Sequence, residues 1–164
     1  MRRRVIAAAA LALVAGAACG GGGTESDAGG HLRVERRGSR TATLMDEPGR
    51  ADYCAAETLL TIIAIGHNRA AGFAVRTAFP LREPRTFVVQ SVLGGLGTAT
   101  AAFRLVNGSA RLGAAGSLRL EPSPGIEGEF EVTVPDSAGT PVEFRGKVSR
   151  IPIRSGSRES CPGA

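Results

Sequence analysis

The residues able to do chemistry are few in this chain of 164 residues, and their spacing matches no catalytic motif. The two histidines, His31 and His67, are 36 positions apart, and neither belongs to an H-x-x-x-H pattern. A zinc site needs three or four closely placed ligands, and a serine hydrolase needs a Ser, a His and an acid within hydrogen-bond reach. No G-x-S-x-G elbow is present. We therefore expect no metal site, no cofactor, no catalytic residue and no enzyme activity.

Two further clusters could be taken for binding sites. Residues 94–98, GGLGT, lack the Lys-Ser/Thr of a phosphate-binding P-loop and the clear helix start of a dinucleotide loop, so a glycine-rich turn is the better interpretation. Asp46, Glu47, Asp52 and Glu57 gather in one stretch without the spacing or the central Gly of a calcium loop. We interpret these four carboxylates as a solvated acidic surface on a loop.

The first eighteen residues carry the pattern of an export signal. Arg2, Arg3 and Arg4 supply a positive n-region, residues 5–15 form an unbroken apolar run, and residues 16–18 are small, as a signal peptidase requires. The apolar run is shorter than the roughly 20 residues that a helix needs to span a bilayer. We expect residues 1–18 to be a cleaved signal peptide.

Cys19 follows these small residues directly, and a glycine-rich tract, residues 20–30, follows Cys19. The arrangement resembles the lipobox and flexible tether of bacterial lipoproteins, with Ala17 and Ala18 in matching places and Gly16 where the family usually has Leu. The resemblance implies that Cys19 becomes the N-terminus, carries acyl chains such as palmitate and anchors the protein to an inner or outer membrane of the cell envelope. Ordinary cleavage after an A-x-A-like site, which leaves Cys19 as a thiol, is the alternative.

Cys54 and Cys161 remain once Cys19 is assigned to lipid. An even pair of cysteines in an exported domain is most simply a disulfide. The two residues are 107 positions apart. In the chain-entropy model, closing a loop of that length stabilises a fold by about 4 to 5 kcal/mol. We therefore predict a disulfide between Cys54 and Cys161 that holds the last residues of the chain.

Charge and composition exclude two classes of partner. The formal net charge of +5 falls to +2 when the three arginines of the signal peptide are removed, because 17 basic and 15 acidic groups remain. The basic residues are scattered along the chain, and only 4% of all residues are aromatic. Nucleic-acid binding needs basic charge gathered on one face, and sugars or single strands need aromatic platforms for stacking. We expect neither nucleic acid nor carbohydrate as a partner.

The remainder, residues 31–164, has the pattern of a single β domain. Short apolar runs with a spacing of two alternate with Gly and Pro turns, which predicts an antiparallel β-sandwich or a small β-barrel of about eight or nine strands. Alanines in residues 55–65 and 99–106 also permit a short helix. The segments predicted as strands are residues 32–35, 41–44, 58–65, 72–79, 86–92, 98–106, 117–121, 126–134 and 142–153.

The hairpin predicted for residues 126–150 also allows a prediction of its register. Its two apolar faces agree if Val132 opposes Phe144. That register places Glu131 opposite Arg145, whereas a shift by two residues would set two glutamates against each other. We therefore predict the register that pairs Val132 with Phe144.

Together these patterns predict a membrane-anchored envelope lipoprotein. Its β domain is expected to have a binding or structural role without catalysis. One alternative is a small β-barrel that carries an apolar ligand or lipid, since eight strands can enclose one. Another is an accessory subunit of an envelope complex, which would show an exposed apolar patch. A filled core would favour a structural role, and an apolar cavity of several hundred cubic ångströms would favour the carrier.

Overall fold

The computed structural model describes residues 29–38, 41–104 and 109–155, so that Cys19 and Cys161 lie outside the described residues. Within them the chain forms eleven strands and one short 3₁₀ turn but no α-helix, which confirms the all-β class. The elements are β1 (His31–Arg36), β2 (Ala42–Cys54), η2 (Ala55–Glu57), β3 (Leu59–Gly66), β4 (Arg69–Arg76), β5 (Arg85–Gln90), β6 (Thr98–Arg104), β7 (Arg111–Leu112), β8 (Ala115–Pro122), β9 (Ile126–Pro135), β10 (Pro141–Ile151) and β11 (Ile153–Ser155).

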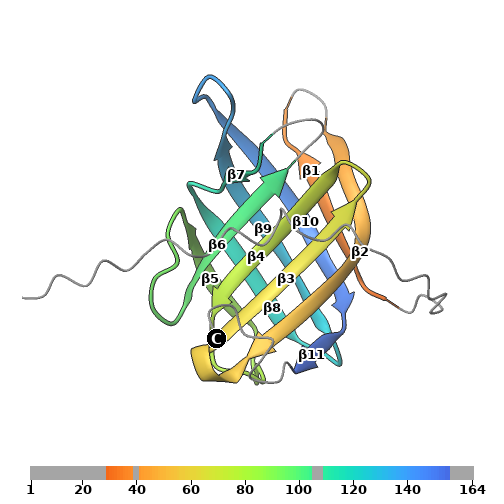
Figure 1. Ribbon diagram of the computed structural model, residues 1–164, viewed down its shortest axis with the longest axis vertical. Helices are drawn as coiled ribbons and strands as arrows, with labels where there is room; N and C mark the ends of the chain where they lie inside the picture. Colours follow the sequence, from red (N-terminus) through yellow and green to blue (C-terminus); the bar gives the residue numbers. More distant parts are fainter. Residues whose placement is uncertain (1–28, 39–40, 105–108, 156–164) are drawn as a thin grey trace, which may run out of the picture.

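Nine of these strands close into a barrel (Figure 1). Their order around the wall is β1-β10-β9-β8-β5-β6-β4-β3-β2, and pairing between β1 and β2 completes the ring. The short strands β7 and β11 add to β6 and β2. Of the two architectures expected from the sequence, the barrel is therefore the one that forms, and closure satisfies the backbone groups that an open sheet would leave at its edges.

The register predicted for the last hairpin is confirmed. Val132 on β9 opposes Phe144 on β10, and Glu131 opposes Arg145. The reason is the alternation of burial, because Val132 and Phe144 are buried while Glu131 and Arg145 are exposed. The two segments that could also have formed a helix are strands for most of their length. Residues 98–104 form β6, and only residues 55–57 form a 3₁₀ turn before β3 begins.

Two strand pairs are parallel, which the alternating patterns did not reveal. Val88 of β5 pairs with Thr98 of β6 in parallel, because loop 91–97 folds back along the strand instead of reversing it as a hairpin does. β11 runs parallel to β2, with Ile153 opposite Ala51. Pro152, which has no backbone N–H, separates β11 from β10 and ends the long strand predicted for residues 142–153. The barrel is consequently mixed.

The acidic stretch predicted as a loop is instead part of a strand. Asp46, Glu47 and Asp52 belong to β2, which is thirteen residues long. Pro48 and Gly49, which usually disfavour the interior of a strand, lie within β2. In the fold, pairing with β1 on one side and with β3 on the other keeps the segment extended.

The interior of the barrel is packed with alternate residues of every wall strand. At the end of the barrel where β3 begins and β10 ends, aliphatic side chains such as Leu60, Leu120 and Ile151 are fully buried. This end is the lower one in Figure 1. The interior also holds an aromatic cluster in which the Phe73 and Phe130 ring centroids are 4.9 Å apart. Its members are Phe73, Phe103, Phe130 and Phe144.

One inward position on β10 requires glycine. A Cβ at Gly146 would overlap the carbonyl oxygen of Arg33 on β1 and would lie 2.6 Å from Cζ of Phe130. The absence of a side chain lets β10 approach β1 closely and leaves room for the Phe130 ring over the backbone. Gly146 thus allows both the close pairing of β10 with β1 and the packing of the Phe130 ring.

The outer surface has two contrasting sides. We call the outward-facing residues of β1, β8, β9 and β10 the charged flank, because they alternate between carboxylates and Arg or Lys. We call the outward-facing residues of β3 to β7, with loop 91–97, the apolar flank. Among the described residues, the five large hydrophobic side chains that are exposed all lie on the apolar flank: Ile65, Val88, Val92, Leu96 and Leu112.

Candidate functional site

β1 and β6 end, and β10 begins, at one end of the barrel, the upper end in Figure 1. A hollow of about 450 Å³ lies among residues of this end, and we call it the upper mouth. The strands β1, β2, β6, β7, β9 and β10 all contribute side chains near their upper ends. Those on which the site depends are Arg36, Leu44, Phe103, Arg111, Val134, Val142 and Phe144. Because side chains alternate along each strand, these residues project over the interior and not away from it.

The floor of the upper mouth is aromatic. The rings of Phe103 and Phe144 stack with their centroids 5.4 Å apart and their planes at 29°. Both side chains are buried, and Phe73 and Phe130 fill the space around and beneath Phe103. A molecule entering from above would therefore meet an apolar surface and could not pass into the lower barrel.

The rim of the upper mouth is cationic. Arg111 donates a hydrogen bond from Nη1 to the carbonyl oxygen of Pro135 at 3.1 Å, which leaves its other N–H groups open to a ligand. Arg36 is exposed, and its guanidinium makes no ion pair within the described part of the chain. Asp136 carries the one carboxylate of the lining, and its Oδ1 accepts N–H bonds from Ala138 and Thr140, both at 2.8 Å, in the turn between β9 and β10. The rim thus offers two guanidinium groups above an apolar floor.

This arrangement suits binding better than bond-making chemistry. An apolar floor takes up hydrocarbon, and an arginine at the rim pairs with a carboxylate, sulfate or phosphate group. The lining contains neither histidine nor cysteine, and its one carboxylate, Asp136, accepts hydrogen bonds from the backbone of its own turn. In the described residues no group of three His, Cys, Asp or Glu side chains is placed to hold a metal ion.

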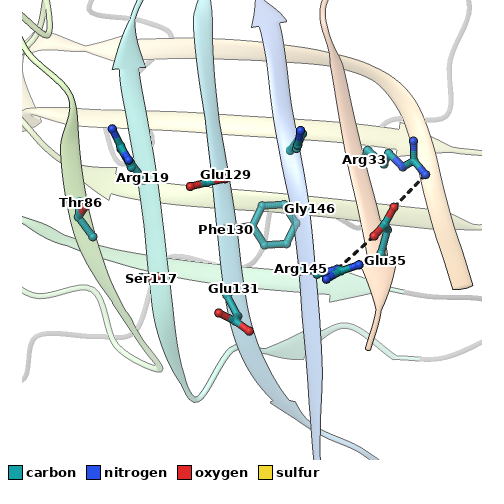
Figure 2. Close-up of a pocket in the computed structure, with 11 residues that line it drawn as sticks. Arg33, Glu35, Thr86, Ser117, Arg119, Glu129, Phe130, Glu131, Arg145 and Gly146 are labelled. Carbon is teal, nitrogen blue, oxygen red and sulfur yellow. Dashed lines mark hydrogen bonds and ion pairs between the residues drawn. The ribbon is translucent and has the colours of Figure 1, made fainter. Parts of the chain in front are cut away.

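A second hollow, of about 650 Å³, lies on the charged flank (Figure 2). It is larger in volume than the upper mouth and is lined mainly by outward side chains of β5, β8, β9, β10 and β1. Neighbouring strands set opposite charges side by side, as with Arg119 and Glu129 on β8 and β9 and with Glu131 and Arg145 on β9 and β10. The Phe130 ring reaches its base beside Gly146.

The charges of this second hollow largely satisfy one another. Glu35 lies 2.8 Å from Nη2 of Arg33 and 3.2 Å from Nε of Arg145, and its side chain is only 17% exposed. Arg37 bridges to Glu131 at 3.0 Å and to Glu143 at 3.4 Å. Cross-strand pairs of this kind stabilise a sheet. We therefore assign the charged flank to holding the wall together and regard the upper mouth as the better candidate for a ligand.

The residues examined in the sequence for chemistry are not brought together. His31 begins β1 and lies 3.4 Å from Asp46, whereas His67 is exposed in the turn between β3 and β4. The glycine-rich turn is confirmed: Gly94 donates its N–H to Oγ1 of Thr98 at 3.1 Å, and β6 follows in place of a helix. Cys54 ends β2 and is buried.

The upper mouth could not be recognised from the sequence. Arg36 and Arg111 are 75 positions apart and sit at the ends of unremarkable strands. The order of the strands around the barrel is what places them on one rim. The signal that did exist is the position of each arginine next to a turn, where a charged side chain can overhang a barrel end.

Comparison with known proteins adds no further constraint. The chain matches no known protein family, no curated protein and no solved structure. Within the described residues, no helix has the length and apolar character needed to cross a bilayer.

Proposed function

We propose that this chain is an exported, lipid-anchored β-barrel that binds a small amphipathic anion in its upper mouth. The observation that carries the proposal is the open hollow of about 450 Å³ floored by Phe103 and Phe144, with Arg36 and Arg111 above it. Its volume lies in the range of about 300 to 1,000 Å³ that is usual for small-molecule sites. The filled lower barrel restricts the ligand to this end.

The chemistry of the ligand follows from the two layers of the site. A hydrocarbon segment would displace water from the aromatic floor, and an acidic group would pair with the guanidinium of Arg36. A ligand without charge would leave Arg36 solvated and gain only the apolar contact. We therefore expect the barrel to prefer a medium-chain carboxylate to the corresponding alcohol.

Isothermal titration calorimetry with decanoate and decanol tests this proposal. We expect decanoate to bind about tenfold more tightly than decanol, a difference that corresponds to about 1.4 kcal/mol. Arg36→Gln should remove most of that preference without affecting the fold, because Arg36 is exposed. Arg145→Gln, on the charged flank, is the matched control and should bind like the parent. Equal binding of both probes, binding of neither, or decanoate binding unchanged by Arg36→Gln would contradict the proposal.

The proposed membrane anchor rests on the pattern around Cys19. Mass spectrometry of the mature protein should find a peptide that begins at Cys19 and carries acyl chains. Cys19→Ser should release the protein from membranes into the soluble fraction. An unmodified N-terminus at Ala18, or a retained signal sequence, would exclude lipidation.

The proposed disulfide is supported by the path of the chain near Cys54. In the parallel pairing of β11 with β2, Ser155 lies opposite Tyr53, the residue before Cys54. Six residues then lead from Ser155 to Cys161, enough to span at most about 20 Å. Non-reducing peptide mapping should recover Cys54 and Cys161 in one linked peptide pair, and two free thiols in the exported protein would refute the pairing.

A further inference from the structure

The apolar flank exposes side chains that a water-facing barrel would be expected to bury or replace. Val92 is 73% exposed, Leu96 64%, Val88 62% and Ile65 52%. The described outward positions of the charged flank hold no comparable residue. Apolar side chains gathered on one side of a soluble domain indicate a surface that meets an apolar partner.

The most exposed of these side chains stand on a well-fixed loop. Loop 91–97 is closed by hydrogen bonds from the Gly94 N–H to Thr98 Oγ1 at 3.1 Å and from Thr98 Oγ1 to the Gly95 carbonyl at 2.7 Å. The Gly97 N–H also donates to the carbonyl of Arg76 on β4 at 2.9 Å. Val92 and Leu96 are therefore held out from the barrel wall by a structured loop.

The strands beside the loop form a smooth surface. Small outward residues, Gly72 and Ala74 on β4 and Ala102 on β6, leave a shallow depression of about 100 Å³ next to Ile63. A flat surface without a deep pocket suits a broad, deformable partner better than a partner with protruding side chains.

Charge separates the two flanks more sharply than hydropathy does. The strands of the charged flank, β1, β8, β9 and β10, contain six glutamates and six Arg or Lys residues. The strands of the apolar flank, β3 to β7, contain neither Asp nor Glu, and by strand alternation their outward arginines are Arg76 and Arg104. One of these arginines, Arg104, has a buried Nε with no hydrogen-bond partner in the described part of the chain.

We propose that the apolar flank docks on the surface of a bilayer that contains anionic phospholipid. Val92 and Leu96 enter the headgroup region, and Arg104 pairs with a lipid phosphate, because the strands of this flank carry no carboxylate to neutralise it. A second copy of the chain fits less well, because Arg76 and Arg104 would meet the same arginines of the other copy, and the strands of this flank carry no carboxylate to pair with them. This contact is separate from the lipid proposed at Cys19 and from the ligand proposed in the upper mouth.

Vesicle co-sedimentation of the mature chain, residues 19–164, carrying Cys19→Ser isolates this contact from both the signal peptide and the lipid anchor. Vesicles of phosphatidylcholine are compared with vesicles that contain about one third phosphatidylglycerol. We expect at least about tenfold stronger partition to the anionic vesicles, weakening as salt is raised. Val92→Ser with Leu96→Ser should lower that partition about tenfold, whereas Val92→Leu with Leu96→Ile should preserve it.

A pair of arginine variants completes the test. Arg104→Gln should weaken partition about threefold, and Arg119→Gln, on the charged flank, should leave it unchanged. Circular dichroism confirms that each variant folds. Equal partition to both vesicle types, or partition unchanged by the Val92 and Leu96 serine variants, would overturn the proposal. So would self-association that these serine variants abolish in protein that does not bind vesicles, since the flank would then belong to a second copy.

Discussion

On the charged flank, Glu131 and Arg145 face water from positions that alternate with the buried Val132 and Phe144. On the apolar flank, Ile65 faces water from β3, whose inward residues, such as Ile62, are buried like Val132 and Phe144 on the other flank. The inward pattern is therefore common to both flanks, and only the outward pattern differs. The comparison teaches that the inward residues determine closure of the barrel, while the outward residues determine what the closed barrel meets.

The largest effect should come from the interior that the two flanks share. Phe130, on the wall of the charged flank, contacts Phe73, on the wall of the apolar flank, so Phe130→Ala should lower the free energy of unfolding by about 3 to 5 kcal/mol. Its neighbour Glu129 points outward, and Glu129→Ala should change stability by less than about 0.5 kcal/mol. Urea denaturation measures both values. Similar losses for the two variants would show that the inward and outward roles are not separate.

A smaller effect is expected where the charged flank approaches the core. Gly146→Ala would force a Cβ against the carbonyl of Arg33 and the ring of Phe130, and should cost about 1 to 3 kcal/mol. Gly95→Ala, in loop 91–97 of the apolar flank, meets no atom within 4 Å and should be neutral or stabilising by a few tenths of a kcal/mol. Thermal unfolding of the two variants measures this contrast. A melting temperature of Gly146→Ala equal to that of the parent would contradict it.

The ion pairs of the charged flank should contribute less than its packing. Glu35 is paired with both Arg33 and Arg145 and is mostly shielded from water, so Glu35→Gln should lower the free energy of unfolding by about 1 kcal/mol. Glu127 has one partner, Arg150, whose side chain is 86% exposed, and Glu127→Gln should have almost no effect. Urea denaturation at low and at high salt tests this, because added salt should reduce the difference in unfolding free energy between the two variants. Equal losses at low salt would argue against the network around Glu35.

The smallest effect is expected from the apolar flank. Ile65 is 52% exposed, so Ile65→Thr should shift the free energy of unfolding by no more than about 0.5 kcal/mol. Ile62→Thr, three residues earlier and fully buried, is the matched contrast and should be destabilising by more than about 1 kcal/mol. A large loss from Ile65→Thr would mean that this side chain supports the fold and is not held for a partner.

Much of the fold could be predicted from the sequence because strand alternation is a local property. The spacing of two at Val132, Val134 and their partners on β10 determined both faces and register. The alternation could not separate a sandwich from a barrel, since both need one apolar and one polar face per strand. It also could not reveal the parallel pairing of Val88 with Thr98, which depends on the path of loop 91–97.

The candidate site was less predictable because it depends on distant parts of the chain. Arg36 and Phe144 meet at the upper mouth only after β1 has paired with β10. The histidines and the glycine cluster were candidates for chemistry in the sequence. In the fold, His31 begins a strand, and His67 and the glycines lie in turns. The position of Arg36 and Arg111 near turns was the only signal, and it pointed to one rim only once the strand order was known.

The pairing of β1 with β10 also has a consequence for how the barrel forms. His31 lies opposite Ser149, so the ring closes through contacts between residues 118 positions apart. No early part of the chain can complete the wall by itself, and β1 must wait for nearly the whole sequence to emerge. Such dependence on non-local contacts slows folding into the range of milliseconds to seconds typical of β-barrels. The export proposed for this chain would gain from this delay, because a barrel that closes so late could pass a channel before its wall is complete.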